Sequence, residues 1–131
     1  MSYLEEAREY FGKDLYASKQ TGIVIEAAEP GYAKCSLKIN DNHKNALGQV
    51  MGGVFFTMAD YAFAIASNLG QPPTVTQTSQ IVYLSAAKGS TLYAETEKIR
   101  GGRKTRFYKI MITDDTGAQI AYVTTTGFVV G

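Results

Sequence analysis

The sequence predicts an α+β protein in which one antiparallel sheet packs against one long, buried helix. Residues 52–69 are apolar on nearly every side, a pattern typical of a buried helix. Two strand-like segments precede this helix and four follow it, joined by short turns that favour antiparallel neighbours. A chain of 131 residues with 45% hydrophobic residues fits one domain with a substantial core.

Before this helix, the pattern predicts one shorter helix and two strands. Residues 2–16 carry apolar side chains at helical spacing. Residues 22–28 and 32–39 have the composition of strands and are separated by a Pro-Gly turn. Residues 40–51 form a polar, irregular connection, and loops of this length tend to be functional. The apolar residues that set the first helical period are Leu4, Ala7, Phe11 and Leu15.

After residue 69 the chain predicts only strands, separated by turn sequences. Gly101-Gly102 indicates a tight turn or a bulge between two of them. A single sheet covers only one side of the apolar helix, so a second subunit is the simplest cover for the rest. We therefore expect at least a homodimer with twofold symmetry. The four predicted strands are residues 74–86, 91–100, 103–114 and 118–130.

Composition excludes several classes of function. A net charge of +1 gives no general attraction to nucleic acid or to an acidic membrane surface. Cys35 is the only cysteine and His43 the only histidine, so neither a disulfide nor a metal centre is indicated. No nucleotide-binding motif, nucleophile elbow, signal peptide or membrane span is recognisable. We expect a cytoplasmic protein without metal or cofactor and without nucleic-acid or membrane partners.

One carboxylate stands out on the apolar helix. Asp60 is the only charged residue between Lys44 and Lys88, and burying a lone carboxylate is costly. Two interpretations remain open: Asp60 lies on an exposed strip of the helix, or it belongs to a functional site.

The start of the same helix offers hydrogen-bond donors. The backbone N–H groups of Gly52 and Gly53 lack partners within a helix and lie at its positive end, where they suit a developing oxyanion. Asn45 adds a side-chain N–H. The alternative is that the glycines only allow close packing. Asp60 lies eight residues beyond Gly52, about 12 Å along the axis, so one site uses both only if they come from opposite subunits.

The spacing of these residues resembles a known family motif. The sequence is similar to the pattern H-x-N-x-x-G-x-x-H-G-G-x-x-F-x-x-A-D of hotdog-fold acyl-CoA thioesterases of the phenylacetyl-CoA thioesterase (PaaI-like) type. Residues 85–89 are similar to the turn S/R-P-A-K-x-G of the same family, and the resemblance spans about residues 22–130. The motif is carried by His43, Asn45, Gly48, Gly52, Gly53, Phe56, Ala59 and Asp60.

The resemblance implies a hotdog fold, in which the sheet wraps around the helix, and dimers that often pair into tetramers. It implies that Asp60 is the catalytic carboxylate, acting as general base or nucleophile. Gly52 and Asn45 would donate hydrogen bonds to the thioester oxygen from the opposite subunit. A strand hydroxyl would orient the water, with Thr76 the first candidate and Thr78 the second, although both also suit an ordinary strand.

One position departs from the family pattern. Met51 replaces the histidine before the two glycines, which indicates an altered site without removing the backbone donor of Gly52. Other expected substrate contacts are Met51, Gly53 and His43, although a structural role for His43 remains open. Arg103 and Lys104 are the first candidates for the phosphates of coenzyme A.

The sequence therefore predicts an enzyme that hydrolyses acyl-CoA to free acid and CoA. The alternative is a hotdog module that binds acyl-CoA without hydrolysing it, as Met51 suggests. A third interpretation, a hotdog dehydratase, has less support, because dehydratase sites pair a histidine with a carboxylate and this helix contains no histidine.

Overall fold

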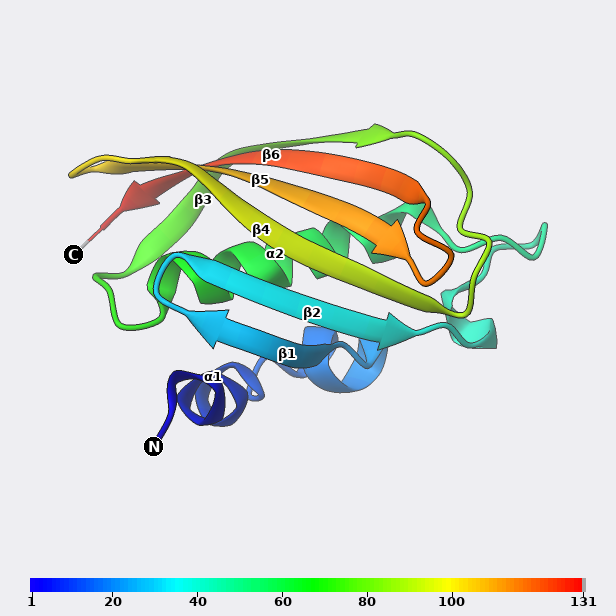
Figure 1. The fold of residues 1–131 in the computed structure, drawn as a ribbon, viewed down its shortest axis with the longest axis horizontal. Helices are drawn as coiled ribbons and strands as arrows, with labels where there is room; N and C mark the ends of the chain where they lie inside the picture. Colours follow the sequence, from blue (N-terminus) through cyan, green and yellow to red (C-terminus); the bar gives the residue numbers. More distant parts are fainter. Residues whose placement is uncertain (131) are drawn as a thin grey trace.

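The computed structural model describes residues 1–130 as a six-stranded antiparallel sheet wrapped around one long helix (Figure 1). The strand order is β1-β2-β4-β5-β6-β3, and each neighbouring pair is antiparallel. This confirms the predicted α+β class and all six predicted strands. The strands are β1 (Val24–Glu29), β2 (Tyr32–Lys38), β3 (Thr74–Tyr83), β4 (Thr91–Gly101), β5 (Thr105–Asp114) and β6 (Gln119–Val129).

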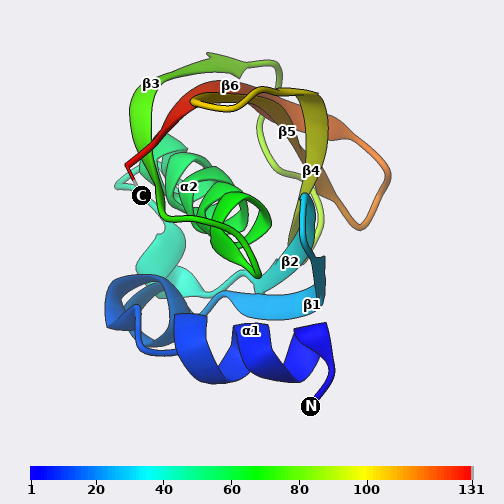
Figure 2. The ribbon, with the colours of Figure 1, turned by 90° about the vertical axis from the view of Figure 1, so that its left-hand side faces the viewer.

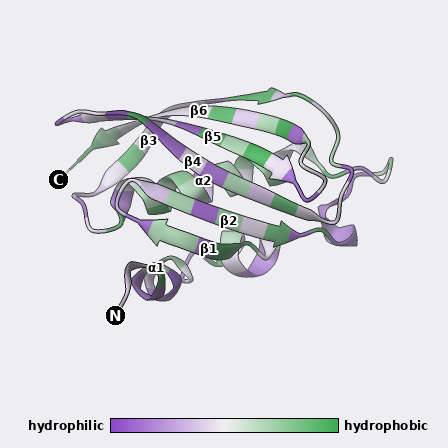
Figure 3. Cartoon of the chain, in the orientation of Figure 1, coloured by the Kyte–Doolittle hydropathy of each residue, from purple (hydrophilic) through white to green (hydrophobic). Residues whose placement is uncertain are grey.

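Helix α2 (Gly52–Asn68) lies in the concave face of the sheet, and its bounds agree with the prediction to one residue (Figure 2). Phe63 packs edge-on against Tyr108 of β5, with ring centroids 5.4 Å apart. Gly127 of β6 permits this approach, because a Cβ there would lie 2.6 Å from Cζ of Phe63. On the strands, hydrophobic and hydrophilic residues alternate, as is clear along β2 (Figure 3).

The first helix is shorter than predicted. Helix α1 (Tyr3–Phe11) begins with a capping box between Ser2 and Glu5 and ends at Gly12, since glycine has low helix propensity. A separate turn of π-helix, η1 (Tyr16–Thr21), follows. Leu15, the last residue of the predicted helical period, therefore lies outside α1, and its side chain is 59% exposed.

The two edges of the sheet differ. Helix α1 covers the β1 edge, where the Arg8 guanidinium donates two hydrogen bonds to the carbonyl oxygen of Ile25, at 3.0 and 2.8 Å. Strand β3 forms the other edge, and within residues 1–130 no strand pairs with its outer side. An open edge presents unpaired backbone groups that can accept another strand.

No helix in residues 1–130 is both long enough and apolar enough to cross a membrane.

Candidate active site

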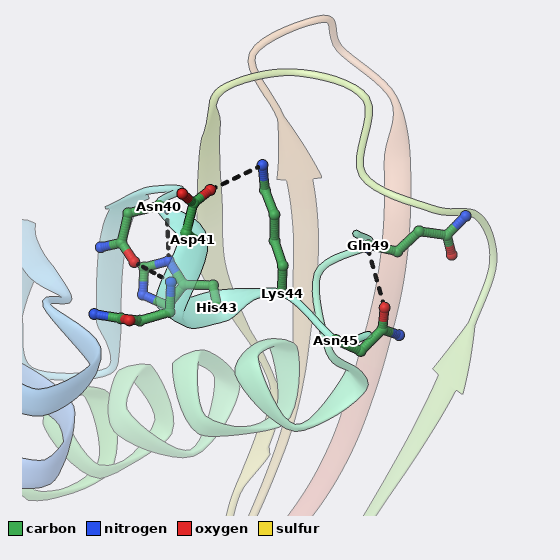
Figure 4. Close-up of polar contacts among 7 residues, drawn as sticks. Asn40, Asp41, His43, Lys44, Asn45 and Gln49 are labelled. Carbon is green, nitrogen blue, oxygen red and sulfur yellow. Dashed lines mark hydrogen bonds and ion pairs between the residues drawn. The ribbon is translucent and has the colours of Figure 1, made fainter. Parts of the chain in front are cut away.

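The loop before α2 is fixed by His43, which ends a short 3-10 helix, η2 (Asp41–His43) (Figure 4). Its Nδ1 accepts a hydrogen bond from the Asn40 N–H at 3.0 Å, so the proton lies on Nε2, which donates to the carbonyl oxygen of Thr21 at 2.7 Å. The side chain is only 4% exposed. Both ring nitrogens are occupied by hydrogen bonds within the chain, which supports the structural role that the sequence left open for His43.

Asn45 lies in the same loop with its side chain held in one orientation (Figure 4). Its Oδ1 accepts hydrogen bonds from the backbone N–H groups of Leu47 and Gln49, at 3.0 and 3.1 Å. These contacts identify the oxygen and leave Nδ2 as the free end, with no partner among residues 1–130. Because the residue is exposed, the Nδ2 hydrogens are available to a ligand.

The helix start presents two further donors. The N–H of Met51 is used in a 2.9 Å hydrogen bond to the carbonyl oxygen of His43. The N–H groups of Gly52 and Gly53 have no acceptor among residues 1–130, as is usual for the first helical turn. Met51 itself is the N-cap residue, and its thioether side chain is 53% exposed.

Tyr83, which sequence reasoning missed, lies against this helix start. A Cβ on Gly52 would lie 2.7 Å from Oη of Tyr83 and 2.8 Å from its Cε1. A Cα–Cβ bond is about 1.5 Å long, so Oη lies within about 4 Å of the Gly52 Cα. Tyr83 is the last residue of β3. Side chains alternate between the two faces of a strand, so counting every second residue from this end of β3 places Tyr83 on the face toward the helix.

Asp60 lies beside a separate cleft of about 290 Å³ on the exposed side of α2. Within residues 1–130 its carboxylate forms no hydrogen bond or ion pair. The surrounding groups partly shield Asp60 from water and so raise its pKa above the ordinary carboxyl value, and the nearby charge of Asp14 raises it further. The cleft is lined by Asp14, Leu15, Tyr16, Ala17, Thr57, Asp60, Tyr61 and Ala64.

The two hydroxyl groups predicted to orient the water, those of Thr76 and Thr78, lie on opposite faces of strand β3. Thr76 pairs with the buried Gly127 on the helix side of the sheet, whereas Thr78 pairs with Thr126 on the outer side. The cause is a bulge at Gln77, which shifts the register so that residues two apart no longer share a face. Thr76, the first candidate for orienting the water, therefore lies on the helix side of β3, whereas Thr78, the second candidate, lies on the outer side.

The basic residues predicted to bind the phosphates of coenzyme A lie far from the start of α2. Arg103 and Lys104 form the turn between β4 and β5, at the opposite end of the molecule from the loop that carries Asn45 (Figure 1). One chain therefore does not bring them to Asn45 and Gly52. A second copy is needed if they are to contact the same ligand.

Sequence comparisons identify relatives over most of the chain. The family model described as the thioesterase superfamily matches residues 47–121, which is more than half of the sequence. A proposed esterase of Archaeoglobus fulgidus is 30% identical over 119 residues, which make up 90% of this chain and 77% of that protein. Human acyl-coenzyme A thioesterase 13 is 29% identical over 103 residues, 76% of this chain and 74% of that one.

Solved structures share the fold. The PaaI protein from the phenylacetic acid degradation operon of E. coli has a TM-score of 0.85 at 24% identity, covering 98% of this chain and 96% of that one. A hypothetical thioesterase of Streptococcus pneumoniae, solved with coenzyme A, has a TM-score of 0.81 at 29% identity, with 95% and 97% covered. The chain has the hotdog fold that its motif predicts, and it belongs to the thioesterase superfamily.

Proposed function

We propose that this protein hydrolyses acyl-CoA thioesters at a site shared by two copies of the chain. The observation that carries the proposal is a pair of donors with no acceptor among residues 1–130, Nδ2 of Asn45 in the loop before α2 and the N–H of Gly52 at the start of α2. About two helical turns beyond Gly52 lies Asp60, whose carboxylate has no hydrogen-bond or ion-pair partner among residues 1–130. Preorganised donors for an oxyanion and a carboxylate of raised pKa are the parts that thioester hydrolysis requires.

Symmetry explains how these parts meet. Asp60 is about 12 Å along the helix axis from Gly52, too far for one water molecule to contact both within a chain. The open edge of β3 offers a place for the same strand of a second copy. In such a twofold dimer, Asp60 of one copy faces the donors of the other, and each dimer contains two equal sites.

In the proposed reaction, the thioester oxygen accepts hydrogen bonds from the Gly52 N–H and the Asn45 amide. Asp60 of the other copy acts either as general base, taking a proton from the attacking water, or as nucleophile, forming an anhydride that water cleaves. The carbon–sulfur bond breaks, and CoA leaves as the thiol after receiving a proton. Thr76 lies on the helix side of β3 and is our candidate for orienting the water.

The relatives support CoA thioesters as the substrate class. The human relative is an acyl-coenzyme A thioesterase, and the streptococcal structure contains coenzyme A. A different function, binding acyl-CoA without hydrolysis, is favoured by one observation. At the N-cap, the exposed thioether of Met51 stands where the family motif has an imidazole, and it donates no hydrogen bond.

Release of CoA thiol from short, long and aromatic acyl-CoAs, compared between wild type and Asp60→Asn, distinguishes the two functions. We expect the substitution to reduce kcat by roughly 10²–10⁴ without weakening substrate binding. Asp41→Asn is the matched control, because it removes an exposed carboxylate that forms an exposed ion pair with Lys44 at 3.6 Å. Equal rates for Asp60→Asn and wild type would contradict hydrolysis by Asp60, and binding without thiol release would support the alternative.

A further inference from the structure

Among residues 1–130, the lining of the cleft beside Asp60 includes a second carboxylate and no basic side chain. The charged residues that line it are Asp14, in the turn between α1 and η1, and Asp60, on α2. The Asp14 carboxylate has no hydrogen-bond or ion-pair partner among residues 1–130. Its negative charge is therefore not neutralised by a neighbouring residue.

The rest of the lining is mostly apolar. Leu15 and Tyr16 are 59% and 70% exposed, although large apolar side chains are usually placed where they lose contact with water. With Ala17 and Ala64 they form a wall next to the Asp60 carboxylate. The cleft volume of about 290 Å³ is at the lower end for small-ligand sites, enough for an acyl group and too small for CoA.

We propose that this cleft holds the acyl group of the thioester and that Asp14 restricts it to acyl groups without a negative charge. The inference rests on the proposed function, because the cleft becomes an acyl site only if Asp60 acts on the thioester carbonyl. Asp14 is a specificity-determining residue in this account. A carboxylate at the far end of an acyl chain would lie in a cleft lined by the like charges of Asp14 and Asp60 and by apolar side chains, so its binding would be disfavoured.

The expected discrimination follows from the charges. Two like unit charges about 6 Å apart repel strongly enough, at the effective dielectric constant of a protein surface, to change an equilibrium by roughly 100-fold. Screening by salt and exposure of Asp14 reduce this effect. We therefore expect roughly 10-fold to 100-fold discrimination against an acyl group that carries a terminal carboxylate.

Asp14→Asn removes the charge and little else. The backbone carbonyl of Asp14, which accepts hydrogen bonds from Ala17 and Ser18 at 3.1 and 2.9 Å, is unchanged by the substitution. Glu9→Gln is the matched control, since Glu9 is an exposed carboxylate on the same segment that lines the neighbouring cavity and not this cleft.

The test compares kcat/KM for hexanoyl-CoA with adipoyl-CoA, and for octanoyl-CoA with suberoyl-CoA, because each pair differs only by a terminal carboxylate. Wild type should prefer the uncharged member at least 10-fold. Asp14→Asn should reduce that preference about 10-fold by accelerating the dicarboxylic substrates, while Glu9→Gln leaves it unchanged. On wild type alone, raising the ionic strength should lower the preference, a readout that needs no variant.

A second readout is the pH profile. The titratable groups lining the cleft with Asp60 are Asp14 and Tyr16 from the N-terminal segment and Tyr61 from α2. Removing the charge of Asp14 should move the acid limb of kcat/KM to lower pH, because Asp60 then ionises more easily.

An unchanged preference in Asp14→Asn, or an equal change in Glu9→Gln, overturns the inference and leaves the proposed hydrolysis standing. Absence of thiol release from all four substrates would overturn both.

Discussion

Placing a methyl group on Gly52 separates the donor role of this residue from simple packing. In Gly52→Ala the new Cβ would lie 2.7 Å from Oη of Tyr83, so the phenol must move by about 1 Å to reach ordinary contact distance. Tyr83 is 55% exposed, so it moves at low cost. Replacing glycine by alanine in a helix gains about 0.5–1 kcal/mol. The net change in the free energy of unfolding should therefore be within about 1 kcal/mol.

Catalysis should respond much more strongly. Side chains of a helix tilt toward its N-terminus, so the methyl group enters the region into which the Gly52 N–H points. Crowding this donor should cost roughly 10²–10³ in kcat, the usual effect of losing one oxyanion contact. Gly53→Ala is the matched comparison, because its Cβ would meet no atom within 4 Å and its backbone N–H is retained.

Thiol release and urea unfolding of both variants decide between the two interpretations. Similar kcat values for Gly52→Ala and Gly53→Ala would refute an oxyanion contact at Gly52. A large loss of stability in Gly52→Ala would instead show that the glycine is needed for packing.

Three further predictions concern Asn45, Asp60 and Asp114. Asn45→Asp keeps the oxygen that accepts the two loop N–H groups and removes the Nδ2 donor, so thiol release should fall at least about 100-fold with an unchanged melting temperature. Because the pKa of Asp60 is raised, kcat/KM should fall as pH decreases through a value above the usual carboxylate range near 4, which a pH–rate profile measures. Asp114 is 3% exposed, and its hydrogen bonds from Thr116 and from the N–H of Lys88 hold its pKa below the ordinary value. Asp114→Ala should therefore cost about 3 kcal/mol in urea unfolding, and the wild-type contribution should be complete above pH about 4 and lost as pH falls toward the lowered pKa.

The arrangement of elements was predictable because its causes are local or periodic. The apolar surface of residues 52–68 requires burial on all sides, and short turns between strands require antiparallel neighbours. The first helix was predicted too long because Leu15 continues the helical spacing of apolar residues beyond Gly12. The prediction followed this spacing and did not treat Gly12 as the end of the helix. Its exposed side chain contributes instead to the cleft beside Asp60.

The candidate site was predictable only in part. Asn45, Gly52 and Asp60 stand out because their spacing matches a motif, but no spacing indicates that both nitrogens of His43 are occupied. The bulge at Gln77, which separates Thr78 from Thr76, depends on how β3 pairs with β6 and has no signal within the strand itself. Tyr83 and Asp14 reach the site only through the tertiary fold.

Mixing two inactive variants shows whether the carboxylate and the donors of one site come from opposite copies of the chain. Asp60→Asn and Asn45→Asp should each be nearly inactive alone. After random exchange of subunits, about half of the dimers are mixed, and each mixed dimer contains one intact site. We expect recovery of about a quarter of the wild-type thiol release, whereas no recovery despite confirmed subunit exchange would show that the two groups do not come from opposite copies.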